Sequence, residues 1–172
     1  MHQSIALIGL PGVGKSTIGK ILAGKIGVDF VDTDAVIEQQ IGQTIRAYFS
    51  EHGESVFRML EKQTLQQLFN SDTHRIIATG GGSVLDQENR QLMRDKAIVV
   101  YLESTVEQLA LRLQADQKRP LLIGDVYARL EELHQQREVL YKEAADFSVN
   151  VSLHSAEETA QLIIEQFGLA SL

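Results

Sequence analysis

One segment near the N-terminus, Gly9-Leu-Pro-Gly-Val-Gly-Lys-Ser16, matches the pattern G-x-x-x-x-G-K-[ST] and lies between a strand-like run and a helix-like run. Glycines let the backbone wrap around phosphate oxygens, and a helix N-terminus adds partial positive charge. We expect Lys15 to reach the terminal phosphates and the Ser16 hydroxyl to ligate Mg²⁺. The alternative, a glycine-rich turn that binds nothing, leaves the lysine and serine unexplained. The motif therefore predicts a mononucleotide site at Gly12, Val13, Gly14, Lys15, Ser16 and Thr17.

Two acids follow the second predicted strand, in the run Asp32-Thr33-Asp34. This position is the carboxyl edge of a parallel sheet, where ligands bind. One carboxylate is suited to hold Mg²⁺, directly or through water, and the other to accept the proton of a substrate hydroxyl during phosphoryl transfer. Both face the cleft only if the strand has ended. The alternative is that Asp34 caps the following helix.

Two arginines fall on apolar helix stripes. Arg58 is paired by i, i+3 spacing with Glu61, which stands in the middle of a buried-type stripe, and Arg137 lies on the apolar stripe of a later helix. A buried charge needs a partner, and an arginine facing the core either extends to solvent or meets an anion. The two arginines, Arg58 and Arg137, together predict an acidic acceptor substrate. The alternative for Arg58 and Glu61 is a plain surface ion pair.

Three consecutive glycines, Gly80, Gly81 and Gly82, follow the third predicted strand and allow the backbone to approach a ligand closely. A crowded turn is the alternative. No aspartate follows this strand, so Asp32 is the better candidate for the metal. Arg119 lies in the longest predicted loop and is expected to fold over the phosphates, unless it belongs to an ordinary solvated basic loop.

Composition sets limits on function. The chain has 172 residues, a net charge of −7 and no cysteine, which excludes disulfides and thiolate chemistry and argues against nucleic acid as a partner. It shows neither a secretory signal nor an apolar run long enough for a bilayer, so we expect a cytoplasmic enzyme that contacts no membrane. The GTPase motifs N-K-x-D and D-x-x-G do not occur, which favours a small-metabolite kinase.

Strands alternate with helices along the chain, which predicts one α/β domain with a parallel sheet covered on both faces. Strands are predicted at Ser4–Gly9, Asp29–Asp32, Arg75–Ala78, Ala97–Leu102 and Phe147–Val151. Helices are predicted at Lys15–Ile26, Ala35–Ile41, Thr44–Glu51, Glu54–Phe69, Gln87–Arg94, Val106–Leu113, Val126–Ala144 and Ala156–Phe167. The segment 115–125 is predicted as a loop.

The ordered motifs GLPGVGKST, DTD, FRMLE, TGGG, RPLL and REVLY resemble the signature of the shikimate kinase family. The resemblance implies a P-loop kinase fold of the nucleoside-monophosphate-kinase type, with a five-stranded parallel sheet in the order 2-3-1-4-5. It also implies one domain over 1–172, with an acceptor-binding region at about 33–61 and a lid at about 112–125. The implied reaction is ATP plus shikimate giving shikimate 3-phosphate and ADP, with Mg²⁺, on the pathway to chorismate and the aromatic amino acids. A monomer is expected.

By the same resemblance, Asp34 would bind the acceptor hydroxyls, and Arg58 and Arg137 would clamp the shikimate carboxylate beside the three glycines. Lys15 and Arg119 would bracket the transferred phosphoryl group. The remaining implied roles are Mg²⁺ ligation by Ser16, support of its water shell by Asp32, and stacking on the adenine by Arg112.

The chain departs from the family at its end, because 151–172 contains no Arg or Lys where many members have a basic residue near the adenine. Two rival functions stay open from the residues. One is a kinase for another small metabolite, such as gluconate, on the same fold. The other is a non-catalytic nucleotide-binding module that signals by closing its lid.

Overall fold

A five-stranded parallel sheet forms the centre of the computed structural model, which describes residues 3–115 and 125–170. The strand order is β2-β3-β1-β4-β5, and every pair of neighbours is parallel. This is the order that the family resemblance implied. The strands are β1 Ser4–Ile8, β2 Asp29–Asp32, β3 Arg75–Ala78, β4 Ala97–Glu103 and β5 Phe147–Asn150.

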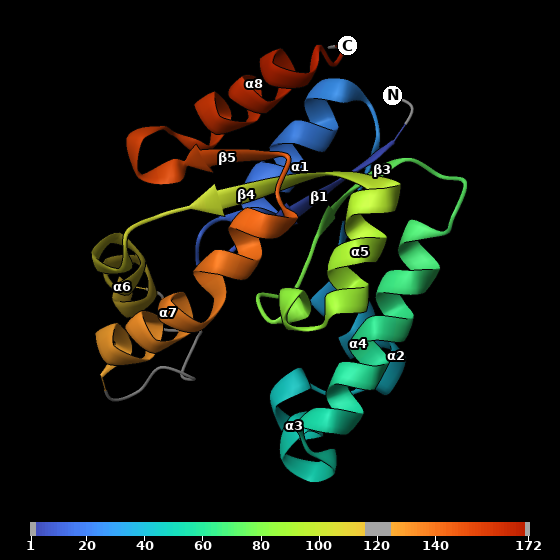
Figure 1. Cartoon of the computed structure of the whole chain (residues 1–172), viewed down its shortest axis with the longest axis vertical. Helices are drawn as coiled ribbons and strands as arrows, with labels where there is room; N and C mark the ends of the chain where they lie inside the picture. Colours follow the sequence, from blue (N-terminus) through green and yellow to red (C-terminus); the bar gives the residue numbers. More distant parts are fainter. Residues whose placement is uncertain (1–2, 116–124, 171–172) are drawn as a thin grey trace.

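Helices cover both faces of the sheet, giving three layers (Figure 1). α1 and α8 pack together on one face, and α4, α5 and α7 lie on the other, with α6 against α7. The α-helices are α1 Lys15–Ile26, α2 Thr33–Ile41, α3 Ile45–His52, α4 Glu54–Phe69, α5 Gln87–Lys96, α6 Val106–Ala115, α7 Val126–Ala144 and α8 Ala156–Phe167. Short 3₁₀ helices follow two strands, η1 at Ser83–Leu85 and η3 at Val151–Leu153.

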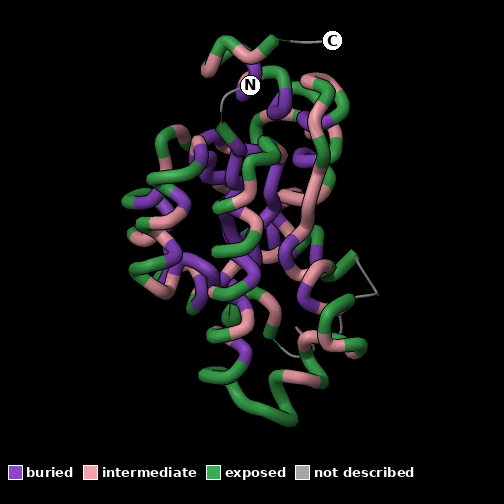
Figure 2. The backbone as a smooth tube through the Cα atoms, turned by 90° about the vertical axis from the view of Figure 1, so that its right-hand side faces the viewer, coloured by how far each residue is buried: buried purple, intermediate pink, exposed green. Residues whose placement is uncertain are grey.

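The sheet is the core of the molecule. All five residues of β1 are buried, and Val99 and Val100 of β4 are inaccessible to solvent. A strand with helices on both faces has no polar face, which explains why these runs are continuously apolar rather than alternating. Figure 2 shows the buried backbone at the centre and an exposed tip at the far end, where α3 has no buried residue.

The strand register brings the ends of β1, β2 and β3 to one edge of the sheet. Asp32 pairs with Ala78, and Ala78 pairs with Leu7. The backbone N–H of Thr79 donates to the Leu7 carbonyl at 3.1 Å, and the N–H of Gly80 donates to the Thr33 hydroxyl at 3.1 Å. These bonds fix the segment after β3 between the phosphate loop and the start of α2.

Element boundaries differ from the predicted ones by a few residues, for local reasons. Thr44 is the N-cap of α3 rather than its first residue, because its side chain accepts from the N–H of Ala47 at 3.1 Å. α2 begins at Thr33 rather than Ala35, because Asp32 provides its cap. The two 3₁₀ helices were not predicted.

No helix in the described ranges, 3–115 and 125–170, is long and apolar enough to cross a membrane.

Candidate active site

The phosphate loop joins β1 to α1 and exposes backbone N–H groups. Gly12 and Gly14 have φ of 82° and 105°, a left-handed backbone that side chains disfavour. Gly14 is the N-cap of α1, and no side chain of the described residues caps the first turn. The N–H groups of that turn therefore stay available to an anion, as the motif predicts.

Two side chains of α1 line this loop. The Lys15 ammonium donates to the carbonyl oxygens of Gly9 and Leu10, at 2.6 and 3.0 Å. The Ser16 hydroxyl donates to the Asp32 carboxylate at 2.6 Å. Ser16 and Asp32, which are sixteen residues apart, thus place a hydroxyl oxygen and a carboxylate side by side at the loop.

A pocket of about 380 Å³ opens in front of the phosphate loop. We call it the main pocket. Its lining includes the acids Asp32 and Asp34, the pair Arg112 and Leu113, and Thr79 and Gly81 after β3. The remaining lining residues are Pro11, Gly12, Gly14, Lys15, Ser16, Thr17 and Ala78.

The two acids at the end of β2 differ from each other in whether they cap α2. Asp32, not Asp34, is the N-cap of α2, because its Oδ1 accepts from the N–H groups of Asp34 and Ala35 at 2.9 and 3.3 Å. The alternative of an Asp34 cap is therefore wrong. Capping by Asp32 leaves the Asp34 carboxylate, in the first turn of α2, to line the main pocket.

Burial raises the pKa of the Asp34 carboxyl from 3.8 to about 6. The negative charges of Asp32, Glu61 and Glu38 act in the same direction, and Lys15 opposes them. A carboxylate with a pKa near the working pH is well matched to accept a proton from a hydroxyl. Asp34 is the described residue best suited to that role.

Each of the three glycines lies against at least one of the charged groups predicted from the sequence. A Cβ at Gly80 would lie 2.9 Å from both Asp34 Oδ1 and Glu61 Oε2, and a Cβ at Gly81 would lie 3.3 Å from Arg137 Nη1. A Cβ at Gly82 would lie 2.7 Å from the Arg58 Cζ. The turn is crowded, as the alternative proposed, but the crowding comes from the candidate site itself.

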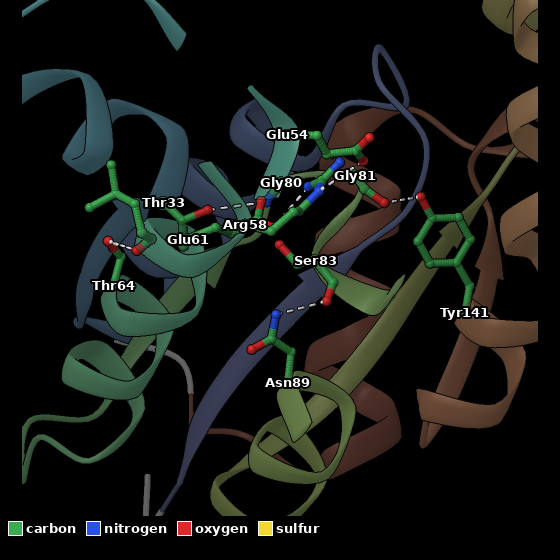
Figure 3. A network of polar contacts seen from close by, with 11 residues as sticks. Thr33, Glu54, Arg58, Glu61, Thr64, Gly80, Gly81, Ser83, Asn89 and Tyr141 are labelled. Atoms are coloured by element: carbon green, nitrogen blue, oxygen red, sulfur yellow. Dashed lines mark hydrogen bonds and ion pairs between the residues drawn. The ribbon is translucent and has the colours of Figure 1, made fainter. Parts of the chain in front are cut away.

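Arg58 and Glu61 form a bonded pair on α4 (Figure 3). Arg58 Nη1 donates to Glu61 Oε1 at 2.8 Å, and Glu54 lies 3.6 Å from Arg58 Nε. Glu61 is only 1% exposed, so this is not a surface pair. Burial raises the pKa of Glu61, while the Arg58 charge and hydrogen bond lower it.

Arg137 enters the same region from α7 and is 8% exposed. Its Nε is buried without a hydrogen-bond partner in the described part of the chain. A buried donor without a partner is costly, and an anionic ligand would satisfy it. Arg58 and Arg137 are not among the described residues that line the main pocket. Arg137 lies next to the lining residue Gly81, and Arg58 lies next to the adjacent Gly82.

A second, smaller pocket of about 210 Å³ adjoins the phosphate loop on the other side of Arg112. Arg112 Nη1 donates to the Val13 carbonyl at 3.2 Å. Val151 and His154, which follow β5, complete the wall with Gly14, Thr17, Ile18, Ala156 and Thr159. His154 is half-buried and lines this pocket.

Arg119, the predicted lid residue, lies outside the described residues, as does most of the predicted lid at 112–125.

Known proteins resemble this chain over nearly its full length. A family model described as "Shikimate kinase" matches residues 11–167. A shikimate kinase of Paracidovorax citrulli is 45% identical over 149 residues, covering 86% of this chain and 81% of the relative, and one of Thermobifida fusca is 40% identical over 164 residues, covering 95% and 94%. The chain belongs to the shikimate kinase family.

A solved structure agrees with this family. Shikimate kinase from Acinetobacter baumannii in complex with shikimate superposes with a TM-score of 0.89 at 35% identity, covering 96% of this chain and 92% of the other. Membership of the shikimate kinase family makes the chain a kinase that phosphorylates shikimate with ATP.

Proposed function

We propose that this chain transfers the γ-phosphoryl group of ATP to the 3-hydroxyl of shikimate, giving shikimate 3-phosphate and ADP. One observation carries the assignment of roles: the Asp34 carboxyl, with a pKa raised to about 6, lies in a pocket between the phosphate loop and the glycines that touch Arg137 and Arg58. A proton acceptor thus stands between a donor site for phosphate and a cationic site for a carboxylate.

On the acceptor side, Asp34 orients the shikimate hydroxyls and takes the proton of the attacking one. Arg58 and Arg137 bind the shikimate carboxylate, and Gly80, Gly81 and Gly82 let the ring approach the backbone. Support comes from the buried, unpartnered Arg137 Nε and from the Arg58–Glu61 bond, which orients one guanidinium. The acceptor-binding region is then about 33–61 together with α7.

On the donor side, the backbone N–H groups of 12–17 cradle the phosphates, and Lys15 and Arg119 bind the transferred group. The Ser16 hydroxyl and the Asp32 carboxylate suit Mg²⁺, which prefers oxygen ligands and completes its shell with phosphates and water. When bound, the ion would offset negative charge on the phosphates. Positioning and electrostatics then supply most of the rate enhancement.

The smaller pocket beside Arg112 is the proposed place of the adenine. It borders the phosphate loop through Gly14 and Thr17, and Arg112 separates it from the main pocket. Since 151–172 has no Arg or Lys, His154 and Arg112 are the polar side chains proposed to contact the base.

We also propose a cytoplasmic monomer that forms one domain over 1–172. The three most exposed large apolar side chains of the described residues, Leu153, Met59 and Val139, stand on three different elements, η3, α4 and α7. Gel filtration at micromolar concentration is expected to give the mass of one chain, and a dimer mass would contradict the proposal.

An acceptor panel tests the function. ADP release is measured with ATP and Mg²⁺ in the presence of shikimate, gluconate or no acceptor, and the product is identified by phosphorus and proton NMR. We expect turnover with shikimate alone and phosphate on the 3-hydroxyl. Turnover with gluconate, or equal ATP hydrolysis without acceptor, would reject the proposal in favour of one of the two rival functions.

A further inference from the structure

Tyr141 is a buried polar residue for which the reaction so far gives no task. It lies on α7 one turn after Arg137, and it is 1% exposed. Its hydroxyl donates to the Gly81 carbonyl at 2.6 Å, across sixty residues of sequence (Figure 3). Arg137 and Tyr141 therefore approach the same glycine from the same helix.

The ring of Tyr141 is fixed from the other side. It stacks on Tyr101 of β4, with centroids 5.0 Å apart and an angle of 22° between the planes. Tyr101 pairs in the sheet with Ile8, the residue before the phosphate loop. A stacked ring has few alternative orientations, so its hydroxyl is held at one position relative to the sheet.

Gly81 is the point where the two substrate sites meet. A Cβ there would lie 3.2 Å from Pro11 Cδ and 3.4 Å from the Gly9 carbonyl oxygen, both in the phosphate loop, as well as 3.3 Å from Arg137 Nη1. A shift of the Gly81 peptide would therefore change its contacts with both the phosphate loop and the guanidinium.

We propose that Tyr141 is a positioning residue, whose hydroxyl holds the Gly81 peptide and the Arg137 guanidinium in the arrangement that binds the acceptor carboxylate. This inference rests on the proposed function and adds a residue to it. Burial raises the pKa of Tyr141 to about 12, against the opposing charge and hydrogen bond of Arg137, so the hydroxyl keeps its proton and donates throughout the neutral range.

The test compares Tyr141→Phe with Tyr101→Phe, which removes a hydroxyl from the other member of the same stacked pair. Phenylalanine keeps the ring at either position. We expect Tyr141→Phe to raise the KM for shikimate about three- to tenfold, the usual effect of one lost hydrogen bond, and to leave the KM for ATP within about twofold. Tyr101→Phe is expected to leave both constants within about twofold.

A double mutant separates positioning from a general loss of structure. If Tyr141 acts through the carboxylate site, adding Tyr141→Phe to Arg137→Met costs less than about twofold more in kcat/KM for shikimate. Three results would each overturn the inference. Tyr141→Phe could lower kcat/KM for shikimate by the same factor in the wild type and in Arg137→Met, it could raise the KM values for shikimate and ATP equally, or it could leave the kinetics unchanged. Calorimetric titration with shikimate at low temperature gives the same comparison if a variant is less stable.

Turnover of the wild-type protein distinguishes failure of the proposed function from failure of this inference. Wild-type protein without shikimate-dependent turnover overturns the proposed function and, with it, this inference. An active wild type with an unchanged Tyr141→Phe variant overturns only the inference.

Discussion

The phosphate loop lies beside the acceptor pocket, the proposed shikimate site formed by Asp34, Arg58, Arg137 and the three glycines, and the two are built from different materials. The phosphate loop is one continuous segment between β1 and α1, and it offers mainly backbone N–H groups shaped by Gly12 and Gly14. The acceptor pocket brings together Asp34 of α2, Arg58 of α4 and Arg137 of α7 around three glycines.

Because of this difference, the phosphate loop and the acceptor pocket differ in what they cost the fold in stability. A loop of backbone amides needs no buried ionised group, whereas the acceptor pocket keeps Asp34, Glu61 and Arg137 largely away from water. Charges removed from water destabilise a fold unless they are paired. The acceptor pocket is therefore the half where function is expected to oppose stability.

The largest expected effect lies on the phosphate side. Lys15→Met should lower kcat about 100- to 1,000-fold, because a cation that stabilises the transferring phosphoryl group is lost, and leave shikimate affinity unchanged. Steady-state kinetics and calorimetric binding of shikimate measure the two quantities. Lys20→Met, on the exposed side of the same helix, is the control and should behave as wild type. Loss of shikimate affinity in Lys15→Met would break the division between the halves.

Asp34→Asn should make the protein more stable at pH 8 by up to about 3 kcal/mol, from 1.36 kcal/mol per unit of the pKa difference between 3.8 and about 6. The folded pKa is the higher one, so the penalty of the wild-type carboxyl is absent well below pH 3.8, grows as the pH rises, and is complete above pH 6. Thermal or urea unfolding at pH 8 and pH 5 measures the gain, which should be roughly halved at pH 5. Asp29→Asn, at an exposed position, serves as the control. A variant that is no more stable at pH 8 than at pH 5, relative to wild type, would contradict the buried charge.

Arg137→Met is expected to weaken shikimate binding, whereas Lys15→Met is expected to slow turnover. The KM for shikimate should rise about ten- to a hundredfold, as for loss of hydrogen bonds to a charged group, while the KM for ATP changes little. Arg129→Met on the same helix removes an exposed arginine whose partner is Glu132, and it should leave both constants unchanged. An effect on ATP as large as that on shikimate would mean that Arg137 serves both halves.

Gly82→Ala should have a smaller effect, raising the KM for shikimate about fivefold. The three atoms nearest to the new methyl group all belong to the guanidinium of Arg58, a flexible side-chain end that can move away, so the fold is retained while the clamp is displaced. Gly24→Ala in α1, where nothing lies within 4 Å of an added Cβ, is the matched control and should slightly raise stability. Unchanged shikimate kinetics in Gly82→Ala would separate Arg58 from the carboxylate site.

Much of this arrangement could be predicted from sequence, because its signals are local. The phosphate loop is one motif, and Arg58, Glu61 and Arg137 stand out as charges on apolar stripes. The choice between Asp32 and Asp34 as helix cap could not be made, since two aspartates two residues apart fit the cap equally well on spacing. It was decided by the residue at which α2 begins, which is Thr33 rather than the predicted Ala35.

Other features depend on packing between distant segments and left no local signal. The bond from Tyr141 to Gly81 exists because α7 packs over β4. His154 becomes part of a pocket only because the turn after β5 lies beside the phosphate loop and Arg112. A histidine in a polar stretch has the same appearance in sequence whether it lines a pocket or faces solvent.

The most direct test of the central claim is ADP release, with and without shikimate, from wild type and Asp34→Asn measured side by side. We predict shikimate-dependent turnover in the wild type and a fall of about 100-fold or more in the variant, as for loss of a positioned proton acceptor, with the KM for ATP unchanged. Because the variant is expected to be the more stable protein, unfolding would not explain the loss. A variant that retains wild-type turnover, or a wild type indifferent to shikimate, would contradict the account.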